Sequence, residues 1–131
     1  MIQTIQRRQF MKASAALAGC TVLPSSVRAF APNAKLRTAH VGVGGMGGAD
    51  LKSISSHTGV EVAALCDVDA NILKTAHAMF PDARTFRDYR EMISEMGDTI
   101  DACVVSTPDH THAPAAMTAM NHGKPVYCQN R

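Results

Sequence analysis

The residues best suited to binding phosphate are six in a row, Gly42 to Gly47, with the sequence Gly-Val-Gly-Gly-Met-Gly. They follow an apolar run that ends at Val41. Gly42 permits a tight turn, Gly44 has no Cβ and lets a pyrophosphate approach the backbone, and Gly47 lets a following helix pack closely on a sheet. The N-terminus of that helix would present free N–H groups to the phosphates. This arrangement predicts a dinucleotide-binding turn.

A carboxylate lies at the chain distance that suits a ribose. Asp67 follows a second apolar run and comes 67 − 47 = 20 residues after Gly47, where its oxygens can accept hydrogen bonds from the adenosine ribose. The alternative is that Asp67 caps the next helix, but Asp69 is better placed to do so. Because a carboxylate repels a 2′-phosphate, the sequence favours NAD over NADP.

A second polar segment, Ser106 to His112, follows another apolar run. In an open parallel sheet, ligands bind beyond the carboxyl ends of the strands where the strand order reverses, so this segment is expected to face the same crevice as the glycine turn. Thr107 and Pro108 are expected beside the nicotinamide ribose, and His112 is expected to point into the crevice.

Histidine and cysteine spacings raise the question of a metal site. His110 and His112 lie two residues apart, but no third ligand joins them, and a zinc site needs three or four protein ligands. We therefore expect no metal, and we expect His110 to be a solvated residue at the start of a helix. No C-x-x-C pair occurs, and Cys66, Cys103 and Cys128 are expected as small apolar core residues.

Apolar runs alternate with helical patterns from residue 36 onward, which predicts a parallel sheet with right-handed crossovers. Strands are expected near 37–43, 60–66, 83–86, 100–106 and 125–128, and helices near 46–57, 70–80, 88–96 and 111–122. The predicted fold class is therefore α/β, a doubly wound parallel sheet of about five strands with helices on both faces.

Two of these helices carry methionine-containing stripes that we expect in the core. The stripes are Tyr89, Met92, Ile93 and Met96 in the helix near 88–96, and Ala113, Ala116, Met117 and Met120 in the helix near 111–122. Gly59, Gly97 and Gly123 are expected to end helices. Pro114 is expected in the first turn of its helix, where a missing N–H is tolerated.

The composition is that of a globular chain with room for one domain. It has 131 residues, of which 46% are hydrophobic and 18% are charged. The formal net charge of +2 is misleading, because residues 1–29 hold four basic residues and no acidic one. The remainder carries 13 − 4 = 9 basic and 11 acidic residues, a net charge of −2. Without a basic patch interleaved with aromatic residues, nucleic acid is not an expected partner.

The first 29 residues are expected to be a targeting signal followed by a linker at 30–35. Gln6 to Lys12, which contains Arg7 and Arg8, resembles the twin-arginine motif, and Val27-Arg28-Ala29 fits a cleavage site. The apolar stretch between them is too short to span a bilayer stably. We expect export in a bacterium, to the periplasm or beyond. The alternative is lipidation at Cys20, because Leu17-Ala18-Gly19-Cys20 matches a lipobox.

Together, the motifs resemble one family. Gly42–Gly47, Cys66–Asp69, Ser106–Pro108 with His112, and Gly123–Cys128 look like the N-terminal half of the glucose–fructose oxidoreductase, inositol dehydrogenase and rhizopine catabolism (Gfo/Idh/MocA) family. The resemblance covers residues 36–129. It implies a Rossmann-type NAD(P)-binding domain of an oxidoreductase that acts on a sugar, cyclitol or similar polyol. The residues expected to contact the cofactor are Gly42, Gly44, Gly45, Met46, Gly47, Asp67, Ser106, Thr107, Pro108, His112 and Gln129.

The sequence departs from the family after Cys128. The family continues Cys-Glu-Lys-Pro or Cys-Gln-Lys-Pro, and its lysine positions the substrate and moves the hydroxyl proton. Here Asn130 occupies the lysine position, and asparagine cannot exchange a proton near neutral pH. We therefore expect no catalytic residue in this chain and no hydride transfer by it alone.

A single-base deletion would explain the final residues. Removing one A from codons for Gln-Lys-Pro-Leu-Thr gives Gln-Asn-Arg and a stop, which is how this sequence ends. The expectation is a dinucleotide-binding domain at 36–131 whose C-terminal substrate domain is absent. An uncovered sheet edge would then favour self-association. The main alternative is a free-standing, non-catalytic NAD-binding module that acts with a partner chain. A methyltransferase is a weaker alternative, disfavoured by the Thr107-Pro108 loop and the export signal.

Overall fold

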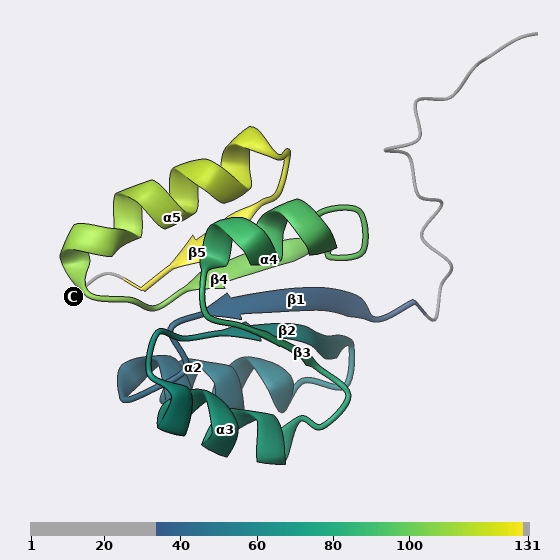
Figure 1. Cartoon of the computed structure of the whole chain (residues 1–131). Helices are drawn as coiled ribbons and strands as arrows, with labels where there is room; N and C mark the ends of the chain where they lie inside the picture. Colours follow the sequence, from purple (N-terminus) through teal and green to yellow (C-terminus); the bar gives the residue numbers. More distant parts are fainter. Residues whose placement is uncertain (1–33, 130–131) are drawn as a thin grey trace, which may run out of the picture. The chain divides into compact units, whose positions relative to one another are not determined.

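A computed structural model describes residues 34–129, which form a five-stranded parallel sheet covered by helices on both faces (Figure 1). The sheet has the order β3-β2-β1-β4-β5. From β1 the chain first adds strands on one side and then crosses to the other, so β1 and β4 flank the switch point. The predicted fold class is confirmed. The elements are β1 (Leu36–Val41), α2 (Met46–Ser55), β2 (Val60–Cys66), α3 (Ala70–Met79), β3 (Arg84–Phe86), α4 (Tyr89–Met96), β4 (Ala102–Val105), α5 (Asp109–Asn121) and β5 (Val126–Cys128).

The predicted elements are all present: β2 has the predicted bounds, and the ends of the others differ by at most two residues. β1 stops at Val41 because Gly42 has a φ of 82° and turns the chain away from the sheet. α5 begins at Asp109, two residues earlier than expected, after the N-cap Pro108. Pro114 therefore lies in the second turn of α5, not the first, and its missing N–H removes the bond to the carbonyl of His110.

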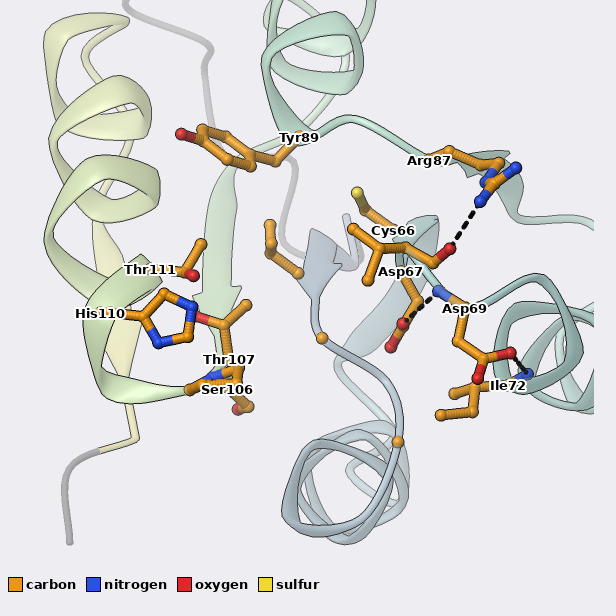
Figure 2. Close-up of a pocket in the computed structure, with 15 residues that line it drawn as sticks. Cys66, Asp67, Asp69, Ile72, Arg87, Tyr89, Ser106, Thr107, His110 and Thr111 are labelled. Carbon is orange, nitrogen blue, oxygen red and sulfur yellow. Dashed lines mark hydrogen bonds between the residues drawn. The ribbon is translucent and has the colours of Figure 1, made fainter.

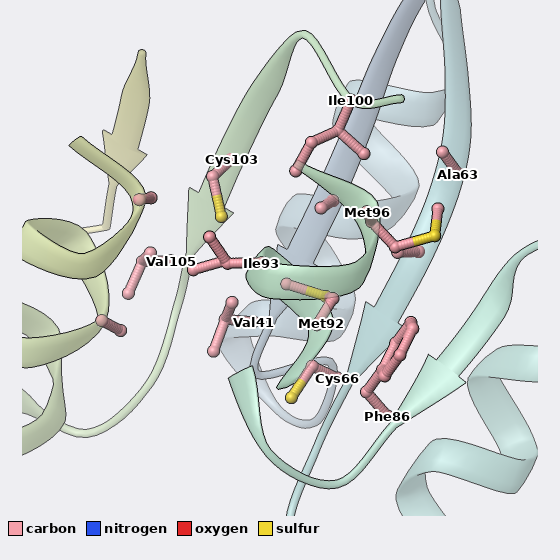
Figure 3. Close-up of a cluster of buried hydrophobic side chains, with 14 residues drawn as sticks. Val41, Ala63, Cys66, Phe86, Met92, Ile93, Met96, Ile100, Cys103 and Val105 are labelled. Carbon is pink, nitrogen blue, oxygen red and sulfur yellow. The ribbon is translucent and has the colours of Figure 1, made fainter. Parts of the chain in front are cut away.

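Helices α2 and α3 cover one face of the sheet, and α4 and α5 cover the other (Figure 1). The stripe of α4 is in the core as predicted: Met92, Ile93 and Met96 are buried between the helix and the sheet (Figure 3). The prediction for α5 is wrong. Its fully buried residues are Ala115 and Ala119, while Met117 is 53% and Met120 is 48% exposed.

The physical reason for the α5 error is the size of its contact residues. Ala115 and Ala119 lie four residues apart and so occupy one stripe of the helix. Their small side chains let α5 approach the sheet closely, and the longer methionines at 117 and 120 fall on the outward side. The prediction had assigned the bulkiest apolar residues to the core.

Helices end at the predicted glycine in two cases of three. After α5, Gly123 has a φ of 72°, its N–H donates to Met120 O, and the N–H of Lys124 donates to Ala119 O at 3.0 Å, a paired C-terminal cap. Gly97 ends α4 but keeps right-handed backbone angles. Gly59 does not end α2, which has already stopped at Ser55.

The cysteines were predicted correctly at two of the three described positions. Cys66 and Cys103 are buried in the core, but Cys128 is exposed on β5, the edge strand. Burial raises the pKa of both core thiols to about 12, so neither ionises near neutral pH. Among the described residues no helix is long and apolar enough to cross a membrane. The predicted signal, Cys20 and Asn130 lie outside the described residues.

Candidate functional site

The glycine turn after β1 is built so that three segments approach each other more closely than side chains would allow. A Cβ on Gly42 would lie 2.6 Å from the carbonyl oxygen of Ser106. A Cβ on Gly47 would lie 2.1 Å from the carbonyl oxygen of Gly42. Atoms do not approach this closely without a bond, so the turn, the start of α2 and the end of β4 require glycine at both positions. The tight turn and close helix packing predicted for these two glycines are confirmed.

The remaining glycines of the turn leave the N-terminus of α2 open. A Cβ on Gly44 would lie 2.8 Å from Cδ1 of Ile72, so the space above this residue is narrow but bounded by a flexible side chain. Gly45 is the N-cap of α2, has a φ of 54° and offers no side-chain acceptor. The first N–H groups of α2 are therefore left without a side-chain cap, as a phosphate site at a helix N-terminus requires.

Asp67 lies at the carboxyl end of β2 and faces the glycine turn. Its Oδ2 accepts the backbone N–H of Val43 at 3.0 Å, and its Oδ1 accepts the N–H of Asp69 at 2.9 Å. Each oxygen retains further acceptor capacity. Asp67 does not cap α3: that role belongs to Asp69, which accepts from Asn71 and Ile72 as the sequence predicted.

A pocket of about 500 Å³ opens at the carboxyl ends of the central strands (Figure 2). Six of the predicted site residues line it, three from the β1 and β2 side and three from the loop after β4. These are Gly42, Gly44, Asp67, Ser106, Thr107 and Pro108. Its volume lies within the range of ligand pockets, which is roughly 300–1,000 Å³. The structure therefore brings the two predicted motifs to one cavity.

A second pocket, of about 330 Å³, lies on the other side of the loop after β4. It is lined by Met46, Ser106, Thr107, Pro108, Asp109, His112 and Gln129. Thr107 Oγ1 and His112 Nε2 are buried and have no hydrogen-bond partner within residues 34–129. Because an unpaired buried polar atom is costly, these two atoms are suited to meet a ligand or an ordered water.

The two histidines in the first turns of α5 line different pockets. His110 lines the larger pocket and His112 the smaller one. The Nδ1 of His112 lies 3.8 Å from Oδ1 of Asp109, too far for a hydrogen bond. Across residues 34–129 no group of three or more His, Cys, Asp or Glu side chains is arranged to hold a metal ion.

Two predicted residues lie outside both pockets. Gly47 is buried beneath the turn, where it determines the position of α2. Gly45 lines a separate open groove between α2 and α3, together with Lys52 and Asn71. Both residues therefore belong to the N-terminus of α2 and not to the walls of the two pockets.

The sequence did not predict nine of the fifteen residues that line the larger pocket. The additional lining residues are Val41, Cys66, Val68, Asp69, Ile72, Arg87, Tyr89, His110 and Thr111. Arg87 comes from the connection between β3 and α4, and Tyr89 is the first residue of α4. The signal that could have found them is topological, because β3 pairs with β2 and must end at the same edge of the sheet.

A partly buried hydrogen bond holds the loop after β4 in place. Ser106 Oγ donates to Asp50 Oδ2 at 2.7 Å, which ties this loop to α2. His40 on β1 is buried, with only 1% of its surface exposed, and its Nε2 lies 3.0 Å from Oγ1 of Thr38. Burial lowers the pKa of His40 to about 4, and the negative charge of Asp50 opposes this shift only in part. His40 is therefore neutral at pH 7.

Comparisons with known proteins agree with this geometry. Residues 36–129 match the model of an oxidoreductase family with an NAD-binding Rossmann fold, and residues 4–24 match that of the twin-arginine translocation signal. A glycosyl hydrolase family 109 protein from Stenotrophomonas maltophilia is 35% identical over 136 residues, which cover 95% of this chain and 29% of the relative.

Solved structures show the same domain. Myo-inositol 2-dehydrogenase from Lactobacillus plantarum superposes with a TM-score of 0.66 at 30% identity, over 72% of this chain and 27% of that enzyme. The WlbA dehydrogenase from Bordetella pertussis, in complex with NADH and UDP-GlcNAcA, superposes with a TM-score of 0.65 at 27% identity. This match covers 72% of this chain and 28% of that enzyme. The chain thus spans less than a third of the length of each of these three relatives.

The matched family model covers most of the chain, and the strand order, the glycine turn and the pocket at the switch point are those of the fold it describes. The chain belongs to the Gfo/Idh/MocA oxidoreductase family, with residues 36–129 as its NAD-binding Rossmann domain and a twin-arginine signal at residues 4–24 that directs export, in bacteria to the periplasm.

Proposed function

We propose that residues 36–129 bind NAD across the two pockets, as the cofactor domain of an exported oxidoreductase that acts on a sugar or polyol. The observation that carries this proposal is the convergence of the glycine turn, Asp67 and the Ser106–Pro108 loop at the carboxyl ends of β1, β2 and β4. The bound cofactor would supply a nicotinamide ring that accepts a hydride. The residues of this chain bind and orient it.

The larger pocket is assigned to the adenosine half of the cofactor. Asp67 is already held by two backbone N–H groups, and its remaining lone pairs can accept from the two ribose hydroxyls. A 2′-phosphate at this place would lie against the carboxylate and be repelled. We infer that NAD binds more tightly than NADP. The pyrophosphate is assigned to the turn from Gly42 to Gly47 and the open N-terminus of α2.

The smaller pocket is assigned to the nicotinamide half. Thr107 Oγ1 and His112 Nε2 are the two buried polar atoms without a partner there, and a carboxamide or ribose hydroxyl would satisfy both. Met46 supplies an apolar wall, and Gln129 lies beyond the end of β5 at the pocket rim. No step of hydride transfer is assigned to any of these side chains.

We infer that the substrate of the whole protein is a cyclitol or sugar, since one relative is an inositol dehydrogenase. Glycoside hydrolysis is a second candidate, favoured by the 35% identity to a glycosyl hydrolase family 109 protein. Hydrolysis of glycosides that depends on a nicotinamide cofactor is known chemistry. Formation of NADH from a polyol would indicate the first function, and release of a chromogenic phenol from an aryl glycoside the second.

The binding proposal is tested by calorimetric titration of the full chain with NAD, NADP and S-adenosylmethionine. We expect NAD to bind most tightly and S-adenosylmethionine not to bind. Binding of S-adenosylmethionine in preference to NAD would overturn the proposal and favour a methyltransferase. NAD binding without turnover of any polyol or glycoside would fit a non-catalytic NAD-binding module, in agreement with Asn130 at the position of the family's lysine.

A further inference from the structure

Sheet register places an arginine beside the ribose-binding carboxylate. β2 and β3 pair in parallel with Cys66 opposite Phe86, so Asp67 and Arg87 are the next residues in register. The N–H of Asp67 donates to the carbonyl of Phe86 at 3.2 Å, which continues the pairing up to this point. The pairing of β2 with β3 therefore determines the position of Arg87.

The guanidinium of Arg87 is held at the wall of the larger pocket by a neutral partner. Its Nη2 donates to the carbonyl oxygen of Val68 at 2.8 Å (Figure 2). The neighbouring arginines are held by acids: Arg84 pairs with Glu95 at 2.6 Å, and Arg90 lies 3.5 Å from Asp88. Within residues 34–129 Arg87 forms no such ion pair. Of the three, Arg87 alone lines the pocket.

Apolar side chains lie exposed in the same part of the pocket. Val68 is 77% and Ile72 is 37% exposed, and both line the cavity with Arg87. A flat guanidinium next to uncovered aliphatic groups suits a flat heteroaromatic ring, which can stack on the one and cover the others. Asp67, one residue before Val68, makes the same place unfavourable for a phosphate.

We propose that Arg87 is the adenine-binding residue of this domain and stacks its guanidinium on the purine ring, an inference that rests on the proposed NAD function. The carbonyl of Val68 fixes the orientation of the guanidinium before the cofactor arrives. Arg87 then contributes equally to NAD and NADP, because both carry the same adenine, and Asp67 alone discriminates between them.

The test compares Arg87→Ala and Arg87→Lys with Arg90→Ala in the full chain. Arg90 is the matched control, since it is an exposed arginine three residues away that does not line the pocket. Dissociation constants are measured for NAD, NADP, AMP and nicotinamide mononucleotide, and thermal melting shows whether each variant is folded. We expect Arg87→Ala to weaken NAD, NADP and AMP by one common factor of about 3- to 30-fold. Nicotinamide mononucleotide, which has no adenine, should bind unchanged, and Arg90→Ala should behave as the parent.

Three results would overturn the inference. A loss confined to NADP would mean that Arg87 contacts a 2′-phosphate. Full affinity in Arg87→Lys, which keeps the charge but not the plane, would mean that a point charge suffices and no ring is stacked. NAD affinity within twofold of the parent in Arg87→Ala would remove Arg87 from the site. If the parent itself binds neither NAD nor AMP, the proposed function fails first, and this inference fails with it.

Discussion

The backbone N–H of Val43 donates to Oδ2 of Asp67 at 3.0 Å, across 24 residues of sequence. This bond joins the glycine turn after β1 to the end of β2. The carboxylate assigned to the ribose is therefore also a structural tie for the turn assigned to the pyrophosphate. Removing the Asp67 carboxylate should therefore affect the ribose site and the pyrophosphate site at once.

Asp67→Ala is expected to weaken the binding of NAD and to reduce the preference for NAD over NADP. The loss of hydrogen bonds to a charged acceptor is worth about 1.5–3 kcal/mol, or roughly 10- to 100-fold in the dissociation constant of NAD. NADP should lose less, because the repulsion of its 2′-phosphate disappears. Calorimetric titration with both cofactors measures the ratio.

Asp69→Ala is the matched control for this prediction. Asp69 lines the same pocket and caps α3 through two backbone N–H groups. Its loss should lower the free energy of unfolding by about 1 kcal/mol and leave the NAD to NADP ratio unchanged. Equal affinities for NAD and NADP in the parent protein would contradict the assignment of Asp67 to the ribose.

Gly47→Ala is expected to be far more damaging than Gly45→Ala, although the two residues belong to one turn. A methyl group at 47 would lie 2.1 Å from the carbonyl oxygen of Gly42, and only a shift of the backbone can relieve that contact. At Gly45 nothing lies within 4 Å, and the cost is that of a φ of 54°. We expect the free energy of unfolding to fall by more than about 3 kcal/mol in Gly47→Ala and by about 1–2 kcal/mol in Gly45→Ala. Urea denaturation of both variants decides, and similar losses would show that the turn relaxes freely.

Replacement of Arg7 and Arg8 together by lysine is expected to keep a fused reporter in the cytoplasm. Both residues lie outside the described part of the chain, and the prediction rests on the twin-arginine signal matched at residues 4–24. Cell fractionation measures the outcome, with Arg28→Lys as a control that leaves the motif intact. Periplasmic reporter from the double variant would mean that another route is used. Mass spectrometry of the exported protein distinguishes cleavage after Ala29 from lipidation at Cys20.

The sequence was most informative where one residue type is physically required. Gly42 and Gly47 cannot carry a Cβ, so their spacing identified the turn, the strand before it and the helix after it. The burial of α4 followed from its periodic apolar stripe. The orientation of α5 did not follow from its sequence, because Ala115 and Ala119 have no strong preference for the core. Close packing of the helix against the sheet buries these alanines and leaves the methionines exposed.

The sequence did not predict several residues of the pocket walls, because their positions also depend on packing between distant segments. Arg87 has no local pattern that marks it as a binding residue. Arg87 lies next to Asp67 only because β2 pairs with β3, in which Cys66 is opposite Phe86, a residue 20 positions later in the sequence. The packing of the whole sheet sets this pairing of distant residues, and local sequence motifs do not reveal it.

His40 gives the domain a pH-dependent stability that is separate from cofactor binding. Its side chain is buried, with a pKa of about 4 against an ordinary value of 6.5. Above pH 6.5 the ring is neutral in both folded and unfolded chains, and it contributes no pH dependence. As the pH falls below 6.5, His40 is protonated in the unfolded chain but stays neutral in the folded protein. The free energy of unfolding therefore declines until about pH 4 and then levels off. The shift corresponds to about 3 kcal/mol at the low-pH limit.

The measurement is the urea midpoint as a function of pH for the parent and for His40→Gln, which keeps a polar side chain beside Thr38 but does not titrate in this range. Asp50, whose charge favours protonated His40, remains in both proteins, so the difference between the two curves isolates the histidine. We expect the His40→Gln curve to be flatter between pH 6.5 and 4, with the gap between the two proteins closing as the pH falls. Parallel curves across that window would show that His40 takes up its proton in the folded state at the same pH as in the unfolded chain, and that burial of the ring does not control its charge.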